Sequence, residues 1–234
     1  MDAIGDHHCV YAVDLVGYGC SDKPSVTYSG EYFVEFVNGF MEAVGIDRST
    51  LIGNSMGGGV SLKFAVLFPN KVDKLVLEDS AGFGEEISIF SRLATLPILG
   101  EWLIRPNRRL ISQILRRCVY DPGKVSDEWI ERIYQMMVTP GARNSMLSTL
   151  RTSCNLAGPR KGALGGIFDN LSSITAPTLI VWGKQDRVLP AAHGRVGVRM
   201  IPNARLHVFD ACGHVPHMER SHEFNDVVLS FLCE

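Results

Sequence analysis

LIGNSMGGG, at residues 51–59, joins an apolar run to a glycine-rich turn that contains a single serine. Gly53, Ser55 and Gly57 form a G-x-S-x-G pentapeptide, and a segment of helical character, residues 60–68, follows. A strand that turns sharply into a helix lifts such a serine hydroxyl above the strand end, and we expect glycine on both sides because a side chain would have no room. Ser55 is thus a candidate nucleophile beside the free N–H groups of a helix start. The alternative is a plain glycine turn with Ser55 as a helix cap.

Short apolar runs alternate with segments of helical spacing along most of the chain. This rhythm predicts an α/β protein: a mostly parallel sheet with helices on both faces. Strands are expected at residues 9–13, 51–52, 75–77, 178–182 and 204–209, and helices at 31–44, 60–68, 190–200 and 221–232.

The alternation of predicted strands and helices stops at residue 81 and resumes after residue 171. Between them lie helix-like pieces separated by prolines, with no convincing strand. We therefore expect a helical cap at residues 81–171, inserted into a core of residues 1–80 and 172–234. Trp102, Trp129 and Met136 of this cap either pack in its interior or line a substrate site.

Three chemically complementary side chains each follow a predicted strand: Ser55, Asp186 and His214. The carboxyl ends of parallel strands meet at one edge of a sheet, so these residues can converge there. We expect His214 to take the Ser55 proton, Asp186 to hold the imidazole, and the Met56 N–H to stabilise an oxyanion. Asp79, just past the third predicted strand, is an alternative acid.

Composition narrows the function further. The formal net charge of −2 gives no electrostatic reason to expect a nucleic acid or membrane partner, and no apolar run approaches the roughly 20 residues of a membrane span. The six cysteines lack C-x-x-C spacing, so we expect neither a metal site nor a disulfide framework. No signal peptide is visible. We expect a cytoplasmic protein with a small-molecule substrate and no cofactor.

Five motifs resemble the α/β-hydrolase fold superfamily, in particular members with a helical cap. That resemblance implies the Ser55, Asp186 and His214 triad, and it disfavours the aspartate-nucleophile epoxide hydrolases and haloalkane dehalogenases because the turn carries serine. The motifs are VDLVGYGCSDKP (residues 13–24), GNSMGG (53–58), LVLEDSAG (75–82), PTLIVWGKQDRVLP (177–190) and CGHVPHMERSHEFNDVVLSFL (212–232).

One departure from the family pattern concerns the N-terminus. In the family, a strand ending in a His-Gly loop precedes the segment that matches Asp14 onwards and donates a second oxyanion N–H. Only thirteen residues precede Asp14 here, and none forms that motif. The family's N-terminal strands are therefore expected to be missing, as in a fragment of a longer hydrolase. Alternatively, residues 9–13 pair directly with the strand before Ser55.

The main functional expectation is a serine hydrolase that acts through an acyl-enzyme on esters of small or medium apolar acids. We place Val215, next to His214, with the cap residues as a substrate-binding candidate. An alternative is a C–C bond hydrolase of ring-cleavage diketones, which GNSMGG and EFNDVVLSFL resemble, although Val215 stands where that branch commonly has tryptophan. The other alternative is a non-catalytic ligand-binding protein or a truncated, weakly active fragment.

Overall fold

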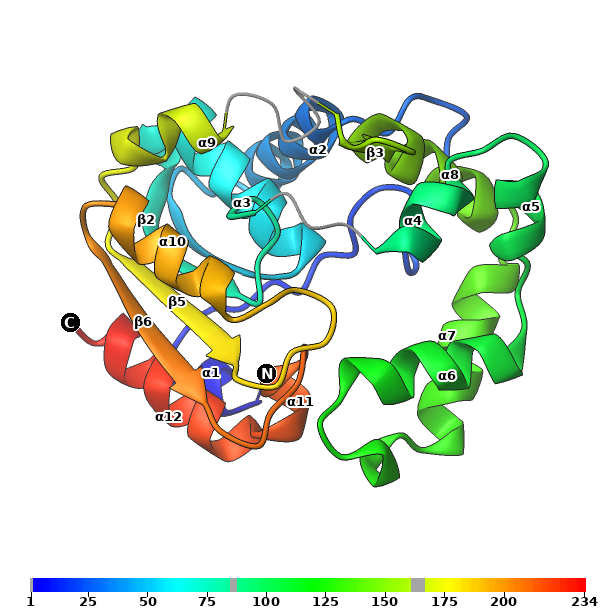
Figure 1. The fold of residues 1–234 in the computed structure, drawn as a ribbon. Helices are drawn as coiled ribbons and strands as arrows, with labels where there is room; N and C mark the ends of the chain where they lie inside the picture. Colours follow the sequence, from blue (N-terminus) through cyan, green and yellow to red (C-terminus); the bar gives the residue numbers. More distant parts are fainter. Residues whose placement is uncertain (1, 85–87, 161–166) are drawn as a thin grey trace.

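A four-stranded parallel sheet forms the centre of the fold in the computed structural model, which describes residues 2–84, 88–160 and 167–234 (Figure 1). The strands run side by side in the order β1-β2-β5-β6. They are β1 (Ser49–Asn54), β2 (Val72–Glu78), β5 (Thr178–Gly183) and β6 (Ala204–Phe209).

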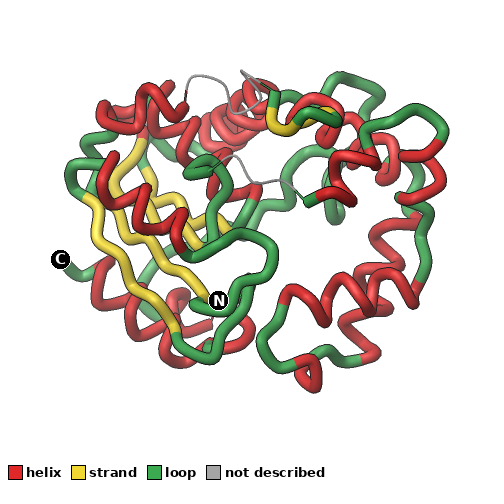
Figure 2. Tube along the Cα trace, viewed as in Figure 1, coloured by secondary structure: helices red, strands yellow, loops and turns green. Residues whose placement is uncertain are grey.

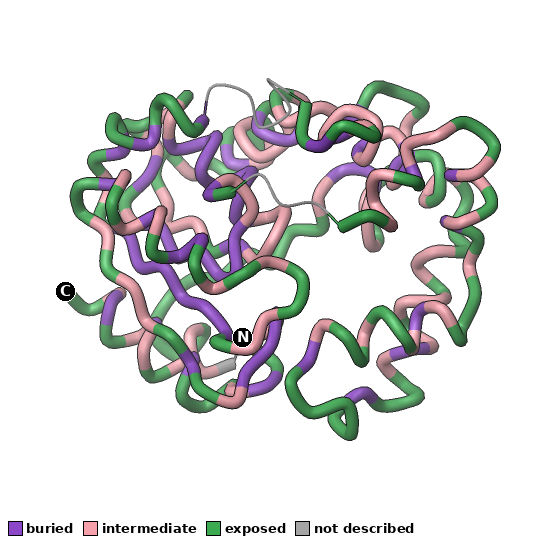
Figure 3. The backbone as a smooth tube through the Cα atoms, viewed as in Figure 1, coloured by how far each residue is buried: buried purple, intermediate pink, exposed green. Residues whose placement is uncertain are grey.

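Both faces of the sheet are covered because successive side chains of a strand point to opposite sides. In β2, Leu75 and Leu77 join the larger hydrophobic cluster, whereas Val76 joins the smaller one. The larger cluster packs the sheet against α2 (Gly30–Ala43), α3 (Met56–Leu67) and residues at the end of α10 (Ala192–Met200), and the smaller one against α12 (Ser221–Leu232). The two central strands, β2 and β5, are largely buried, whereas the outer strands β1 and β6 are mostly half-buried or exposed (Figure 3). The predicted fold class is confirmed.

Between β2 and β5 the chain forms a group of helices that lies to one side of the sheet (Figures 1 and 2). Within the predicted all-helical stretch, two-residue strands also pair antiparallel: β3 (Cys154–Asn155) with β4 (Gly158–Pro159). The helices are α4 (Ile89–Ala94), α5 (Leu99–Leu103), α6 (Arg108–Cys118), α7 (Asp127–Val138) and α8 (Ala142–Ser153).

Short elements complete the described chain. None of its helices combines the length and apolarity needed to cross a bilayer. The short elements are α1 (Asp2–Gly5), η1 (Pro69–Lys71), η2 (Pro122–Lys124), α9 (Ile167–Asn170), η3 (Leu171–Ser173) and α11 (Pro216–Glu219).

The strand predicted at residues 9–13 is wrong. These residues are irregular in the structure, and they do not pair with β1, whose ladder among the described residues is with β2 alone. Tyr11 instead packs its ring edge-on against Phe40 of α2, with ring centroids 5.7 Å apart. A β-branched run forms a strand only where a neighbouring strand supplies hydrogen-bond partners, and this run has none.

The turn from β1 into α3 carries Ser55 at φ 51° and ψ −115°, a conformation that few residues other than glycine adopt. A Cβ on Gly53 would overlap the carbonyl of Gly57, so the first predicted glycine constraint is correct. The second is wrong, because a Cβ on Gly57 would meet nothing within 4 Å. It is Gly58 that has no room, since its Cβ would overlap Ser80.

Alanine substitutions at the two glycines should therefore have opposite effects on stability. Gly53→Ala forces backbone apart and should lower the free energy of unfolding by about 2–3 kcal/mol. Gly57→Ala adds a good helix former in open space and should raise it by about 0.5–1 kcal/mol. Urea unfolding of both variants measures the difference, and equal destabilisation would contradict this account of the turn.

A buried cation links α2 to α3. Lys63 is 4% exposed on α3, and its ammonium forms an ion pair with Glu31 at the start of α2. Burial raises the pKa of Glu31, but the hydrogen bond and the charge of Lys63 outweigh this effect, so the pKa of Glu31 lies below its ordinary value. Glu31 itself is half-exposed, so solvent screens part of the attraction.

Removing the anion should therefore cost more than removing the cation. Glu31→Gln leaves a buried ammonium without a counter-charge and should cost about 1 kcal/mol at pH 7, whereas Lys63→Met should be close to neutral. Because the folded pKa of Glu31 is depressed, the gap between wild type and Glu31→Gln is present above the unfolded pKa and closes as pH falls through the folded value. The free energies of unfolding of wild type, Glu31→Gln and Lys63→Met at pH 7 and pH 3 test both statements.

Candidate active site

Four polar residues follow the four strands of the sheet at its carboxyl edge. Ser55 comes directly after β1, and Asp79 directly after β2. Asp186 and His214 lie in the loops that leave β5 and β6. Since all four strands are parallel, their ends gather these side chains on one side of the sheet.

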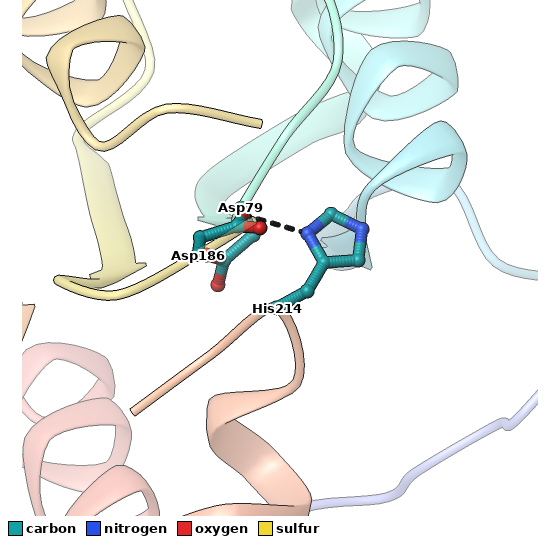
Figure 4. Close-up of side chains that lie close together, drawn as sticks. All are labelled: Asp79, Asp186 and His214. Atoms are coloured by element: carbon teal, nitrogen blue, oxygen red, sulfur yellow. Dashed lines mark hydrogen bonds and ion pairs between the residues drawn. The ribbon is translucent and has the colours of Figure 1, made fainter. Parts of the chain in front are cut away.

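Asp186 and His214 are in direct contact (Figure 4). Oδ2 of Asp186 lies 2.7 Å from Nδ1 of His214, and the Asp186 side chain is fully buried. Its other oxygen accepts backbone N–H groups from Val188 at 2.6 Å and Leu189 at 3.1 Å. A carboxylate can only accept, so Nδ1 of His214 carries the hydrogen and Nε2 is the basic nitrogen of the neutral ring.

The turn that carries Ser55 is tied to its surroundings by backbone hydrogen bonds. The Ser55 N–H donates to the carbonyl of Glu78 at 2.9 Å, and the Ser55 carbonyl accepts from Ala81 at 3.0 Å. Next to it, Nδ2 of Asn54 donates to the His214 carbonyl at 3.0 Å. The serine turn and the histidine loop are thus joined, and Met56 begins α3 immediately after the serine.

Asp79, the alternative acid, lies next to this pair. One oxygen of Asp79, one of Asp186 and a ring nitrogen of His214 lie within 4.8 Å of one another. It is Asp186, however, that holds the hydrogen bond to His214. Oδ1 of Asp79 accepts the Gly183 N–H at 3.0 Å. Burial, and then the charge of Asp186, raise the pKa of Asp79 well above its usual range.

Glu78, beside Asp79, has its own partner. Its buried carboxylate lies 2.8 Å from Nδ1 of His217, whose side chain is 42% exposed. Burial lowers the pKa of His217, but the hydrogen bond and charge of Glu78 outweigh this and raise it above the ordinary value. A protonated His217 would therefore offset the charge of Glu78.

Glu219 is a structural partner of the histidine loop that sequence reasoning missed. Its buried carboxylate accepts the Gly213 N–H at 2.7 Å and the Tyr120 N–H, from the loop after α6, at 2.6 Å. The carbonyl of Cys118, the last residue of α6, accepts the His214 N–H at 2.6 Å. An acidic residue between His214 and α12 looks solvent-exposed in sequence, and no local pattern marks its burial.

The predicted substrate-binding residues do not all lie together. Val215 packs against the hydrophobic cluster of α6 and α7 that also includes Trp129. Trp102, on α5, is 62% exposed, and Met136 is half-buried on α7. The structure therefore places one cap residue and the neighbour of His214 in one apolar group, and their role toward a substrate stays a prediction.

Three comparisons with known proteins agree on the family. Residues 1–221 match the family described as alpha/beta hydrolase fold. The chain is 32% identical to 2-hydroxymuconate semialdehyde hydrolase of Pseudomonas putida, over 96% of this chain and 77% of that protein. It is 31% identical to 2-hydroxy-6-oxo-2,4-heptadienoate hydrolase of Pseudomonas putida F1, over 100% and 81%.

Among solved structures, a meta-cleavage product hydrolase from Pseudomonas fluorescens IP01 superposes with a TM-score of 0.84 at 28% identity. The match covers 99% of this chain and 82% of that one. The chain therefore belongs to the α/β-hydrolase family and is a hydrolase.

Proposed function

We propose that this hydrolase cleaves a carbon–carbon bond in a ring-cleavage diketone, with Ser55 as nucleophile, His214 as base and Asp186 as its acid partner. The observation that carries the proposal is the Asp186–His214 contact at 2.7 Å, with the acid fully buried. It leaves Nε2 of His214 as a base on the sheet edge that also carries the strained Ser55. The substrate class is supported by the two Pseudomonas putida relatives, which are named as hydrolases of 2-hydroxymuconate semialdehyde and of 2-hydroxy-6-oxo-2,4-heptadienoate rather than of esters.

The chemistry divides into two half-reactions. In the first, Nε2 of His214 takes the Ser55 proton, Oγ attacks the ketone carbon, and the Met56 N–H at the start of α3 donates to the oxyanion. The bond to the neighbouring carbon breaks, and that carbon receives a proton from His214. In the second, water activated by His214 hydrolyses the acyl-enzyme and frees the acid. Overall, OH adds to the ketone carbon and H to its neighbour.

Ester hydrolysis uses the same first attack and differs in the leaving group, which is an oxygen that needs little help to depart. We therefore expect the residues proposed here to hydrolyse activated esters slowly as a side reaction. In this assignment the apolar group around Val215 and Trp129 belongs to the binding site, and residues 81–171 act as a cap.

The substrate class is tested by steady-state kinetics with 2-hydroxymuconate semialdehyde, 2-hydroxy-6-oxo-2,4-heptadienoate and p-nitrophenyl esters of increasing chain length. We expect kcat/KM for one of the two ring-cleavage compounds, the semialdehyde or the heptadienoate, to exceed that for any of these esters by at least about tenfold, equal to about 1.4 kcal/mol of extra transition-state stabilisation. If esters are turned over better than both ring-cleavage compounds, the protein is a carboxylesterase instead.

The nucleophile is tested with a fluorophosphonate probe. Labelling should disappear in Ser55→Ala, with turnover falling by about 10⁴-fold or more, because the triad acts as a unit. Ser230→Ala, at an exposed serine on α12, is the matched control and should label like wild type. A wild-type protein that neither labels nor turns over a substrate, yet binds the diketone, would favour a non-catalytic ligand-binding protein.

A further inference from the structure

Asp79 occupies a central place in the sheet edge. It follows β2, which lies between the strands that lead to Ser55 and to Asp186. Its side chain is completely buried, and its backbone sits at φ 41°, where few residues other than glycine are found. The Asp79 N–H donates to Val181 at 3.0 Å. A buried acid in a strained backbone is costly, so its position calls for a reason.

One of the two carboxylate oxygens of Asp79 has no hydrogen-bond partner within the described part of the chain. Oδ1 accepts the Gly183 N–H, but the buried Oδ2 has no hydrogen-bond partner among the described residues. An oxygen of Asp79 lies within 4.8 Å of one of Asp186, whose two oxygens already accept hydrogen bonds from Val188, Leu189 and His214. Two ionised carboxylates cannot bond to each other, whereas one added proton would satisfy both.

The charges near Asp79 also favour a proton on one of the two carboxyl groups. Asp79 lies close to two other acidic side chains, Asp186 and Glu78, and to the ring of His214. Glu78 is paired with His217, and His214 is paired with Asp186, so neither histidine is matched to Asp79. Two like charges this close in a buried site cannot both persist.

We propose that Asp79 is a positioning residue that keeps its proton and donates it to Asp186, so that the carboxyl pair presents one negative charge to His214. This rests on the proposed function. The shared proton orients Asp186 toward the histidine. It also makes Asp79 a reserve acid. When a substitution makes residue 186 neutral, Asp79 loses its proton and carries the negative charge instead.

The central test compares one substitution in two backgrounds. Asp79→Asn keeps an acceptor for Gly183 and an N–H donor for Asp186, so kcat/KM should stay within about threefold of wild type. In an Asp186→Asn background, the same change removes the reserve acid and should cost a further 30-fold or more, approaching the roughly 10⁴-fold loss seen when a triad has no acid. A purely structural role predicts equal costs in both backgrounds and would overturn the proposal.

Asp79→Leu, which lacks the donor, should reduce kcat more than it changes KM. The acid limb of its kcat/KM profile reports protonation of the base, His214. Without the shared proton Asp186 holds a proton on His214 more strongly, so this limb should move to higher pH in Asp79→Leu, while in Asp79→Asn it should stay in place. A loss above about 100-fold in Asp79→Asn alone would make Asp79 the charged acid itself and reject the shared proton.

A stability measurement tests the proton independently of activity. The folded pKa of Asp79 lies above its unfolded value, so the wild-type fold loses stability as pH rises through this interval, and the asparagine variant does not. The midpoint of thermal unfolding for Asp79→Asn should exceed that of wild type by a margin that grows from pH 5 to pH 9. Asp47→Asn, at an exposed carboxylate before β1, should show no such trend.

The two ideas can fail separately. Parallel pH curves for Asp79→Asn and wild type would show that Asp79 holds no extra proton, whatever the enzyme does. A wild-type protein without labelling or turnover, but with diverging curves, would leave the carboxyl pair intact and remove the catalytic assignment.

Discussion

An ionised carboxylate stays inside a protein only where hydrogen-bond donors replace the water it has lost. Asp186 meets this condition with two backbone N–H groups on one oxygen and the ring of His214 on the other. The backbone must turn sharply after β5 to present those groups. Gly183 lets the histidine loop approach the end of β5 closely, because a Cβ there would overlap the carbonyl of Gly213 in that loop. The acid and the base are therefore brought together by backbone contact as well as by charge.

The rest of the sheet edge follows from this packing. β2 lies between β1, which leads to Ser55, and β5, which leads to Asp186. The residue that follows β2 must therefore lie close to Asp186. With aspartate at that place, either one carboxyl is neutral or the two repel. On the other side, Glu219 and the Cys118 carbonyl fix the backbone of the histidine loop. The Cys118 anchor uses main-chain atoms on both sides, which substitutions cannot remove directly, whereas the Glu219 anchor depends on a side chain.

Much of this arrangement could be predicted from the sequence, because it depends on local patterns. Consecutive apolar residues such as Leu75, Val76 and Leu77 indicated a strand covered on both faces, and Ser55 was recognisable from its glycine neighbours. The failures depend on distant partners. Residues 9–13 have strand composition but no neighbouring strand, and the room around Gly57 is decided by what packs near it. The burial of Glu219 and the proximity of Asp79 to Asp186 likewise arise only when separate loops meet.

The hydrogen bond from His214 to the Cys118 carbonyl joins the sheet edge to the last residue of α6. The helices between β2 and β5 thus contribute to the backbone geometry of the histidine, besides any contact they make with a substrate. Exchanging this insertion for that of a relative, as evolution or a protein engineer would do to change selectivity, would also remove one of the histidine loop's fixed points. A grafted insertion would therefore need to place a backbone carbonyl where that of Cys118 lies.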